Sequence, residues 1–579
     1  MHRRYYLIYV PGAEAEIFAT PLPEAAGLRL PEPVRGGPVW VGDRSFPHWL
    51  AADLIRQAKA AVAGLPPRRD HRRPLRAAIA GRLRRWGRSP EFAWEPLSCA
   101  PGRPRPWREA ILAGLEGRIL SAAELRLVLR GKVQAEDLEA ILAELALLGA
   151  VEAMPAVEVL HLDRAVCHRC GETRIDRMDC WFCGERDCWI CPTCGRFGPA
   201  TGCGTLYARP KAAVPRAGRP SEPILDFALT QAQARDAEAL RAFLRSGEGE
   251  FLLWAVCGAG KTEVVLSALA EAFARGDRVL LATPRRDVAA DLALRARAAF
   301  PDLSFAVHHG GRHEEESPDP DLTVATTHQC LRFYRAFDLV VLDEVDAFPY
   351  HGNEMLYFAV SRAGRPGGRT VYVTATPPME IEKRASSGSL SHVRLPVRHH
   401  GHPLPVPELI RSPLGRPTPG WRVPAPLEGI LTEAVAGGRR SLVFVPTVQA
   451  AGVVGRELAR WGSERGLRIA WLHAADPARE EKRRLFAEGG LDVLVATTVL
   501  ERGLTLGPLD VCVLFADCEA VFDAATLIQM AGRAGRLASD PAGRVHFLAE
   551  RIGAAMKAAH AAIVATNDEA AREGFLHEK

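Results

Sequence analysis

The chain has 579 residues, several times the length of one ordinary domain, so its length favours several packed units over a single core. It is 47% hydrophobic and 25% charged, an average composition for a globular protein that excludes a largely disordered or fibrous chain. The net charge of +5 permits an anionic partner without requiring one.

The sequence has no feature that is typical of a secreted or membrane-spanning protein. The basic start is followed by only a handful of apolar residues before Pro11, and no later apolar run approaches the roughly 20 residues that span a bilayer. We therefore expect a cytoplasmic protein, in which clustered thiols hold a metal more readily than they form disulfides.

Residues 1–105 form an N-terminal region rich in proline and arginine, with one strand-like run at Tyr5–Val10. Nine arginines face a single acid in segment 66–88, a composition that can grip a nucleic-acid backbone. Leu75, Ile79 and Leu83 recur at four-residue steps in the same segment, which equally indicates an amphipathic helix with a solvated polar face. The sequence leaves both interpretations open and gives the region no role.

Residues 106–160 carry leucines and isoleucines at helical spacing, interrupted at Gly131 and ended at Gly149. Two or three short helices followed by the apolar stretch Val157–Leu160 predict an α-rich module. A winged-helix-like module and a helical spacer both fit this pattern.

Eight of the thirteen cysteines fall within residues 161–208, three of the pairs having the form Cys-x-x-Cys-Gly of a zinc knuckle. A tetrahedral Zn²⁺ takes four ligands, so eight thiols can hold one or two ions. The pairing cannot be read from the sequence, His168 is a further candidate ligand, and an iron–sulfur cluster is the metal alternative. Interleaved arginines and aromatic residues can stack on single-stranded bases or pack around the metal-held core. The predicted metal ligands are Cys167, Cys170, Cys180, Cys183, Cys188, Cys191, Cys194 and Cys203.

A linker rich in proline, glycine and arginine spans residues 209–223, and two series of short apolar runs alternating with helical patterns follow it. This alternation predicts an α/β fold of two tandem domains with doubly wound parallel sheets. The first domain spans residues 224–395, a proline-rich bridge spans 396–440, and the second domain with a C-terminal helix spans 441–579.

The segment Ala255–Thr262 has the form of a phosphate-binding loop between an apolar strand and a helix. Gly258 and Gly260 let backbone N–H groups approach phosphate oxygens, Lys261 reaches the β and γ oxygens, and the Thr262 hydroxyl suits Mg²⁺. Farther along the chain, a second apolar strand ends in Asp343 and Glu344. We expect the Asp343 carboxylate to hold Mg²⁺ and Glu344 to polarise the attacking water.

The second α/β domain carries two arginines, Arg533 and Arg536, three residues apart in a segment predicted to be one helix. From across a cleft, one of them can act as an arginine finger on the γ-phosphate. Because it comes from another domain, hydrolysis then depends on domain closure.

These motifs, with Thr374–Pro377, Ala496–Gly503 and Gln529–Arg536, occur in the order of the superfamily 2 helicases over about residues 229–547. The segments Val256–Glu263, Ala282–Val288, Asp343–Tyr350 and Thr497–Gly503, preceded by a cysteine module, more narrowly resemble the ComFA family of late competence proteins. Members of that family are cytosolic ATP-driven motors of bacterial DNA uptake. The likeness covers about residues 160–550, and it implies that the two tandem α/β domains are RecA-like motor domains.

The resemblance implies further roles for single residues. Gln233 lies near the adenine, Gln529 contacts ATP across the cleft together with Arg533 and Arg536, and Asp346 couples the acidic loop to the motor. Thr374 and Thr376 link hydrolysis to DNA binding. The residues that the resemblance places along the DNA, these two included, are Thr283, Arg285, Arg286, Thr374, Thr376, Thr497, Thr498 and Arg502.

The sequence therefore predicts a DNA-stimulated ATPase that translocates on single-stranded DNA and uses ATP, Mg²⁺ and one or two Zn²⁺. Its expected partners are single-stranded DNA and competence machinery proteins at the inner face of the cell membrane, where peripheral association is open, as is a homo-oligomer. A replication-restart helicase of the PriA type is the enzymatic alternative. A nucleotide-gated DNA-binding scaffold without motor activity is the alternative from another class.

Overall fold

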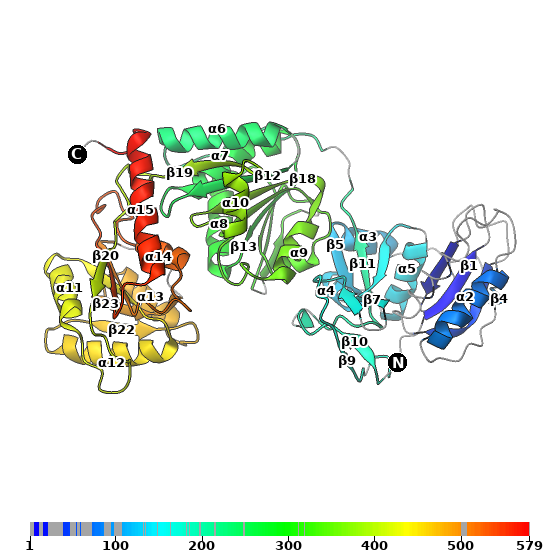
Figure 1. Cartoon of the computed structure of the whole chain (residues 1–579). Coiled ribbons are helices and arrows are strands. Elements are labelled where there is room, and N and C mark those ends of the chain that lie inside the picture. The colour runs from blue at the N-terminus through cyan, green and yellow to red at the C-terminus, as the bar shows by residue number, and fades with distance from the viewer. Residues whose placement is uncertain are drawn as a thin grey trace.

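The computed structural model describes the helices, strands and most connections of the chain, and every structural statement below concerns these residues: 5–10, 16–20, 39–46, 54, 58, 72–85, 94–97, 107–130, 133, 135–147, 149–161, 164–180, 182–184, 186–195, 198–212, 216–246, 249–310, 312–317, 319–498 and 507–577. They form an N-terminal sheet, a middle module and two α/β domains (Figure 1).

The N-terminal sheet is antiparallel, with the strand order β2-β1-β3-β4. Only the first of its strands has a counterpart in the sequence prediction. On the helix of this region, Leu75, Ile79 and Leu83 are fully buried, which is the amphipathic packing that their spacing indicates. The elements are β1 (Tyr5–Val10), β2 (Glu16–Thr20), β3 (Val39–Phe46), α2 (Arg72–Arg85) and β4 (Trp94–Leu97).

The middle module is a three-stranded antiparallel sheet, of order β5-β11-β6, with three helices. Its strand β11 comes from the end of the cysteine segment, so the sheet crosses the boundaries predicted at residues 160 and 208. The cysteine segment is thus an insertion between β6 and β11, and it contains two hairpins, β7–β8 and β9–β10. The elements are α3 (Arg108–Leu115), β5 (Arg118–Ser121), α4 (Ala122–Val128), α5 (Ala135–Leu147), β6 (Glu152–Pro155), β7 (Val157–His161), β8 (Arg164–Cys167), β9 (Asp176–Met178), β10 (Cys188–Ile190) and β11 (Thr205–Arg209).

The first motor domain is built on an eight-stranded sheet of order β15-β14-β16-β13-β17-β18-β12-β19, parallel except for the β14–β15 pair. Its elements are α6 (Gln231–Ser246), β12 (Gly249–Ala255), α7 (Lys261–Ala274), β13 (Val279–Thr283), α8 (Arg286–Ala299), β14 (Phe305–His309), β15 (Arg312–Glu315), β16 (Leu322–Thr326), η3 (Gln329–Arg332), β17 (Phe337–Asp343), α9 (Glu354–Ala363), β18 (Gly364–Thr374), α10 (Met379–Ser386) and β19 (Ser391–Leu395).

The second motor domain has a parallel sheet of order β20-β25-β24-β21-β23-β22. The predicted proline-rich bridge contributes to this domain, because it contains the edge strand β20 and the helix α11. The elements are β20 (Glu408–Arg411), α11 (Ala425–Ala436), β21 (Arg440–Phe444), α12 (Val448–Ser463), β22 (Ile469–Leu472), α13 (Arg479–Ala487), β23 (Val493–Ala496), β24 (Leu509–Leu514), α14 (Ala524–Ala531), β25 (Val545–Ala549) and α15 (Ala554–Arg572).

Strand β17 shows why the central strands are continuously apolar. Leu339 and Val341 pack into a core with α6, α7 and α8 on one face of the sheet, whereas Val340 and Leu342 pack into a core with α9 on the other. A parallel strand that is covered by helices on both faces has no solvated side to mark with polar residues. Among the helices that the structure describes, none combines the length and apolarity needed to cross a bilayer.

Candidate functional site

The phosphate loop joins β12 to the first turn of α7, as the sequence predicts. Gly258 and Gly260 adopt φ values of 83° and 78°, a left-handed backbone that glycine tolerates without strain. Gly260 caps α7, so Lys261 is the first residue of the helix, and the helix N-terminus is a ready site for phosphate. A Cβ at Gly260 would collide with the Gln233 amide, so this side chain sets how closely the loop is packed.

Lys261 and Asp343 meet at the carboxyl ends of two strands of the same sheet. The Lys261 Nζ lies 3.8 Å from the Asp343 Oδ1, and each side chain is about 20% exposed. The backbone N–H of Glu344 donates to the Asp343 Oδ1 and to the Val373 carbonyl, both at 2.9 Å, and Glu344 itself has a φ of 58°. This left-handed turn fixes the carboxylate of Asp343 directly beside the ammonium of Lys261.

Thr262 and Asp343 line one small cavity together with Lys261 and five apolar residues, so the two oxygen-bearing side chains lie close together. They are the residues that would hold Mg²⁺. The Thr262 hydroxyl and the Asp343 carboxylate are hard oxygen donors of the kind that Mg²⁺ prefers. The Thr262 Oγ1 accepts a hydrogen bond of 3.3 Å from Arg295, so its lone pairs face polar groups.

Gln233 is buried against the phosphate loop. Its Nε2 donates to the Ala259 carbonyl at 2.8 Å, and its Oε1 accepts from the Thr230 N–H at 2.9 Å. The side chain therefore ties α6 to the loop, and a contact with adenine stays a prediction.

The acidic loop is wired to the strand end that carries Thr374 and Thr376. Both hydroxyls donate to the Asp346 carboxylate, at 2.5 Å and 2.6 Å. From the second motor domain, the Gln529 Nε2 donates to Thr376 Oγ1 at 3.1 Å and to Asp346 Oδ2 at 3.3 Å. The Gln529 Oε1 accepts from the thiol of Cys257 at 2.9 Å. One buried glutamine thus contacts the phosphate loop and the acidic loop from across the domain interface.

Arg533 and Arg536 lie beyond the end of α14 and not on its face. The helix ends at Ala531, because its carboxyl cap is Gly532, so the prediction of one continuous helix through both arginines is wrong. Arg533 is 4% exposed, and the Nε of Arg536 donates back to the Gly532 carbonyl at 2.8 Å. The two arginines therefore follow this turn rather than a helical repeat.

Arg398 is a residue that the sequence analysis missed. Its Nη1 donates to the Ala534 carbonyl at 2.7 Å and its Nη2 to the Gly532 carbonyl at 3.4 Å, and its stem lies against Gly258 of the phosphate loop. Burial and then repulsion from Arg536 lower the pKa of Arg398 to about 9. In an arginine-rich chain no spacing marks such a residue, yet it joins the phosphate loop to the arginine turn.

His399 and His400 extend the contact of Arg398 in both directions. The N–H of His399 donates to the Gly258 carbonyl at 3.3 Å, and the Nε2 of His400 is 3.1 Å from the Gly535 carbonyl. Burial lowers the pKa of His400 to about 4, so the imidazole is neutral near pH 7. The segment after β19 is therefore bound to both sides of the domain interface.

The residues predicted to lie along DNA have different surroundings. Thr283 and Thr374 are fully buried and Thr376 is engaged by Asp346, so their side chains do not face a surface strand. The placement of Thr374 and Thr376 fits the coupling role and not a direct contact. Arg285 is half-buried and Arg286 is exposed at the start of α8. Thr497 and Thr498 are half-buried after β23, and Arg502 lies outside the described residues.

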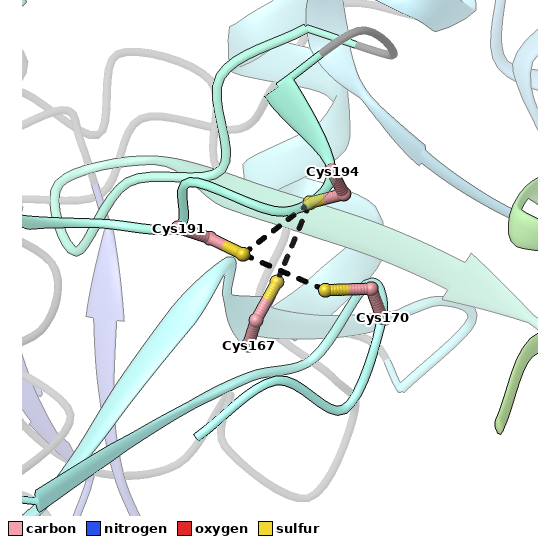
Figure 2. Close-up of side chains that lie close together, drawn as sticks. All are labelled: Cys167, Cys170, Cys191 and Cys194. Carbon is pink, nitrogen blue, oxygen red and sulfur yellow. Dashed lines mark hydrogen bonds between the residues drawn. The ribbon is translucent and has the colours of Figure 1, made fainter. Parts of the chain in front are cut away.

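The eight clustered cysteines divide into two groups of four, all buried, with all sulfurs of a group within 4.8 Å of one another. The inner cluster (Figure 2) comprises Cys167, Cys170, Cys191 and Cys194, and the outer cluster comprises Cys180, Cys183, Cys188 and Cys203. The two sets interleave along the chain, which explains why spacing alone does not give the pairing.

Each cluster has the geometry to hold one tetrahedral Zn²⁺ ion. In the inner cluster, Cys170 and Cys191 lie 3.5 Å apart and Cys167 and Cys194 lie 3.7 Å apart, measured between sulfurs. Zn–S bonds of about 2.3 Å in a tetrahedron put the sulfurs about 3.8 Å apart. Sulfurs this close leave no room between them for an iron–sulfur cluster. The His168 Nε2 binds the Glu158 carboxylate at 2.7 Å, so the prediction of His168 as a further metal ligand is wrong.

The inner cluster is docked on α9 of the first motor domain. The Nη1 of Arg362 donates to the carbonyls of His168 and Arg169, at 2.6 Å and 2.8 Å, and its Nη2 donates to the Leu331 carbonyl at 2.8 Å. Burial lowers the pKa of Arg362 to about 10. Beside it, Gly171 is so close to Phe358 that an added Cβ would lie 2.9 Å from the ring. The inner cluster and the first motor domain therefore share one interface.

Comparison with known families places this geometry in a class. The DEAD/DEAH box helicase model matches residues 233–384, and the helicase conserved C-terminal domain model matches residues 425–538. Together with the phosphate loop, the acidic loop and the two parallel-sheet domains, these matches define a superfamily 2 helicase, an ATP-dependent enzyme of the helicase type.

Three curated relatives narrow the class. The chain is 35% identical over 375 residues to the competence protein ComFA of Bacillus subtilis, covering 64% of this chain and 78% of the relative. It is 33% identical over 409 residues to ComFA of Streptococcus pneumoniae, covering 70% of this chain and 90% of the relative. The replication restart protein PriA of Bacillus subtilis is 26% identical over 197 residues, covering 31% and 24%. The chain therefore belongs to the ComFA family and is a helicase-like motor of competence.

Proposed function

We propose that this chain hydrolyses ATP to move along single-stranded DNA and so draws incoming DNA into the cytosol during transformation. The observation that carries the proposal is the split site, because Lys261 and Asp343 lie on one motor domain, whereas Gln529, Arg533 and Arg536 lie on the other. Gln529 touches both phosphate loop and acidic loop, so a change at either is felt across the interface. Opening and closing of a divided site is the motion that a translocating motor needs.

In this mechanism, the Lys261 ammonium binds the β and γ oxygens while the helix N-terminus of α7 faces the phosphates. Thr262 and Asp343 would hold Mg²⁺, which neutralises phosphate charge when bound. Glu344 orients the attacking water and accepts its proton as the bond to the γ-phosphorus forms and the bond to the ADP oxygen breaks. Arg536 stabilises the charge of the transition state from the second domain.

The link to DNA runs through Asp346. Its carboxylate holds Thr374 and Thr376 of the first domain and Gln529 of the second. Release of phosphate loosens the arginine contact, and the Asp346 network passes this change to the edge of the sheet where Arg285 and Arg286 lie. We propose that the DNA strand is contacted by Arg285, Arg286, Thr497 and Thr498, because cationic and hydroxyl side chains suit contacts with a phosphate backbone.

The test is the ATPase rate of the full chain with and without single-stranded DNA, together with translocation along a single strand. Lys261→Ala is expected to abolish turnover, whereas the exposed Lys383→Ala is a matched control that retains it. Arg536→Ala is expected to keep much of the nucleotide affinity and to lower kcat by about 10³-fold or more, because its contact belongs to the transition state. Turnover retained by Lys261→Ala would refute the assignment of the site.

Two further outcomes separate the proposal from its rivals. Efficient unwinding of a forked duplex would favour a replication-restart helicase, and absence of DNA-stimulated turnover would favour a nucleotide-gated scaffold. We expect competence proteins at the inner face of the membrane as partners, and co-purification from competent cells with and without crosslinking tests this expectation.

A further inference from the structure

A groove between the middle module and the first motor domain has no role in the chemistry above. It has a volume of about 440 Å³, within the range that accommodates a small ligand or a nucleotide. One wall comes from β5, α4 and the turn after α4, and the other comes from β14 and η3. We name it the α4 groove.

The lining of the α4 groove is cationic. Arg118, Arg130 and Arg332 line it together with His308, and Glu124 is its one carboxylate among the described residues. That carboxylate is already paired, because its Oε2 accepts from the Ser121 N–H at 2.9 Å and from the Arg169 guanidinium at 2.8 Å, and its Oε1 lies 3.9 Å from the Arg332 Nε. An anion that enters the groove therefore meets several guanidinium groups and one compensated acid.

The rim of the groove carries an exposed apolar pair. Leu127 is 79% exposed and Val128 is 41% exposed at the end of α4, and both line the groove. Arg126 and Arg130 flank them and are exposed as well. Aliphatic side chains beside arginines at the mouth of a groove can pack against a base while the guanidinium groups hold phosphates of a single strand.

The groove lies near the carboxyl ends of β14 and β16, close to the proposed DNA contact Arg286. His308 stands on β14 two residues before Gly310, against which the exposed Arg286 packs. Directly after the neighbouring strand β16 comes Thr327, whose N–H donates to the Thr283 carbonyl at 3.0 Å, and Gln329 in the groove wall follows two residues later. A single strand of DNA that lies over Arg286 therefore reaches the α4 groove next.

We infer that the α4 groove is a second binding site for single-stranded DNA, outside the two motor domains. Arg118, Arg130 and Arg332 contact phosphates there, and Leu127 and Val128 support a base. This inference rests on the proposed function and names how the strand continues beyond the motor. Its consequence is a longer footprint on DNA than the motor domains alone would give.

The test uses the full chain with Leu127→Ala and Arg130→Ala combined, since both side chains are exposed and Arg118 and Arg332 are tied to other residues of the protein. The matched control combines Leu294→Ala and Arg416→Ala, an exposed leucine and an exposed arginine that do not line the groove. Binding is measured by fluorescence anisotropy with oligothymidylates of about 6 and about 25 nucleotides.

The groove variant is expected to bind the long oligonucleotide about tenfold more weakly than the control, with little change for the short one, because one apolar contact with a base and one phosphate contact are lost. The slope of log K against log salt should fall by about 0.7 for the lost phosphate contact. Arg130→Gly is a second variant, since Arg130 has a φ of 52° and glycine relieves that strain, so weaker binding with an unchanged or raised Tm is expected.

Equal affinities of variant and control for the long oligonucleotide would overturn the inference, as would an equal loss for both lengths. Tighter binding of an oligouridylate than of the oligothymidylate, lost in the groove variant, would reassign the groove to RNA. If the wild-type ATPase responds to single-stranded DNA while the groove variant binds normally, only the groove fails. If the wild-type ATPase does not respond at all, the proposed function fails.

Discussion

The inner and outer cysteine clusters offer the same chemistry in different surroundings. The inner sulfurs belong to a core that continues through α9 into the first motor domain. The outer sulfurs form a small core of their own, with Ile190 as a partly buried neighbour, next to the half-exposed Met178 and Phe182. Four thiols therefore define a metal site in both places. Among the described residues, only the inner site is packed into the core of the first motor domain.

This difference teaches that ligand number does not give the role of a metal site. When a metal ion is lost, the packing that depends on it is lost as well. At the inner cluster that packing includes α9 and Tyr372 of β18, the strand that carries Thr374. At the outer cluster it is a hairpin. The four predictions below, from the largest expected effect on the motor to the smallest, test this contrast.

The largest effect is expected for Cys191→Ser in the inner cluster. Loss of one ligand releases one of two zinc ions per chain and loosens the shared core, so the ATPase rate should fall at least about tenfold, as for other loss of structural metal. Elemental analysis and steady-state kinetics measure the two quantities. Cys518→Ser, at a half-buried cysteine outside both clusters, is the control. An unchanged zinc content would refute the ligand assignment.

Arg362→Ala is expected to weaken the docking of the inner cluster without removing a ligand. Three backbone carbonyls lose their donor, and leaving buried acceptors unsatisfied costs about 2–4 kcal/mol in the free energy of unfolding. Urea denaturation at constant zinc content measures the change. Arg460→Ala, at a side chain that is 75% exposed, should change it by less than about 0.5 kcal/mol. A similar change in the free energy of unfolding for both variants would mean that Arg362 does not hold the inner cluster against α9.

Gly171→Ala probes the same interface through the backbone. Gly171 has a φ of 77°, and a Cβ there costs about 1–2 kcal/mol in conformation in addition to the shift forced on Phe358. Gly195→Ala is the matched control in the same cluster, since a Cβ there would meet nothing within 4 Å. Thermal unfolding of both variants checks the difference. Equal Tm values for the two variants would contradict the close contact between the inner cluster and α9.

The smallest effect on the motor is expected for Cys180→Ser in the outer cluster. One zinc ion should be lost, as in the inner variant, but the ATPase rate should stay within about twofold because the outer core does not reach the motor. The comparison with Cys191→Ser at equal zinc loss is the sharpest form of the contrast. A fall in ATPase rate as large as that of Cys191→Ser would erase it.

The predicted motor elements are found in the structure because their signals are local. A buried parallel strand is apolar throughout, and the two series of short apolar runs that were predicted as strands overlap strands of the two motor sheets. The phosphate loop is equally local, since the left-handed turns at Gly258 and Gly260 and the helix start at Lys261 all lie within a few residues. The strands β14, β15, β19 and β20, which lie at or next to a sheet edge, were missed because their patterns are short and partly polar.

Signals that depend on distant neighbours were missed or misplaced. Arg398 acquires its role only where the segment after β19 meets the turn after α14, so no spacing points to it. Thr283 and Thr374 were placed along DNA from the family motif, but packing buries both side chains. The helix through Arg533 and Arg536 ends early at Gly532, where the chain turns toward Arg398.

The sequence by itself determined the class of fold, the phosphate loop, the acidic strand end and the presence of a cysteine metal module, because each is written in residues that are close in the chain. The tertiary structure alone decided which four cysteines share an ion, that the inner cluster is packed against α9, and that Gln529 and Arg398 bridge the motor domains. These features join residues that are far apart in the chain, and their positions follow from how the sheets and helices pack. Local chemistry is therefore legible from the residues, whereas the coupling between sites depends on the fold.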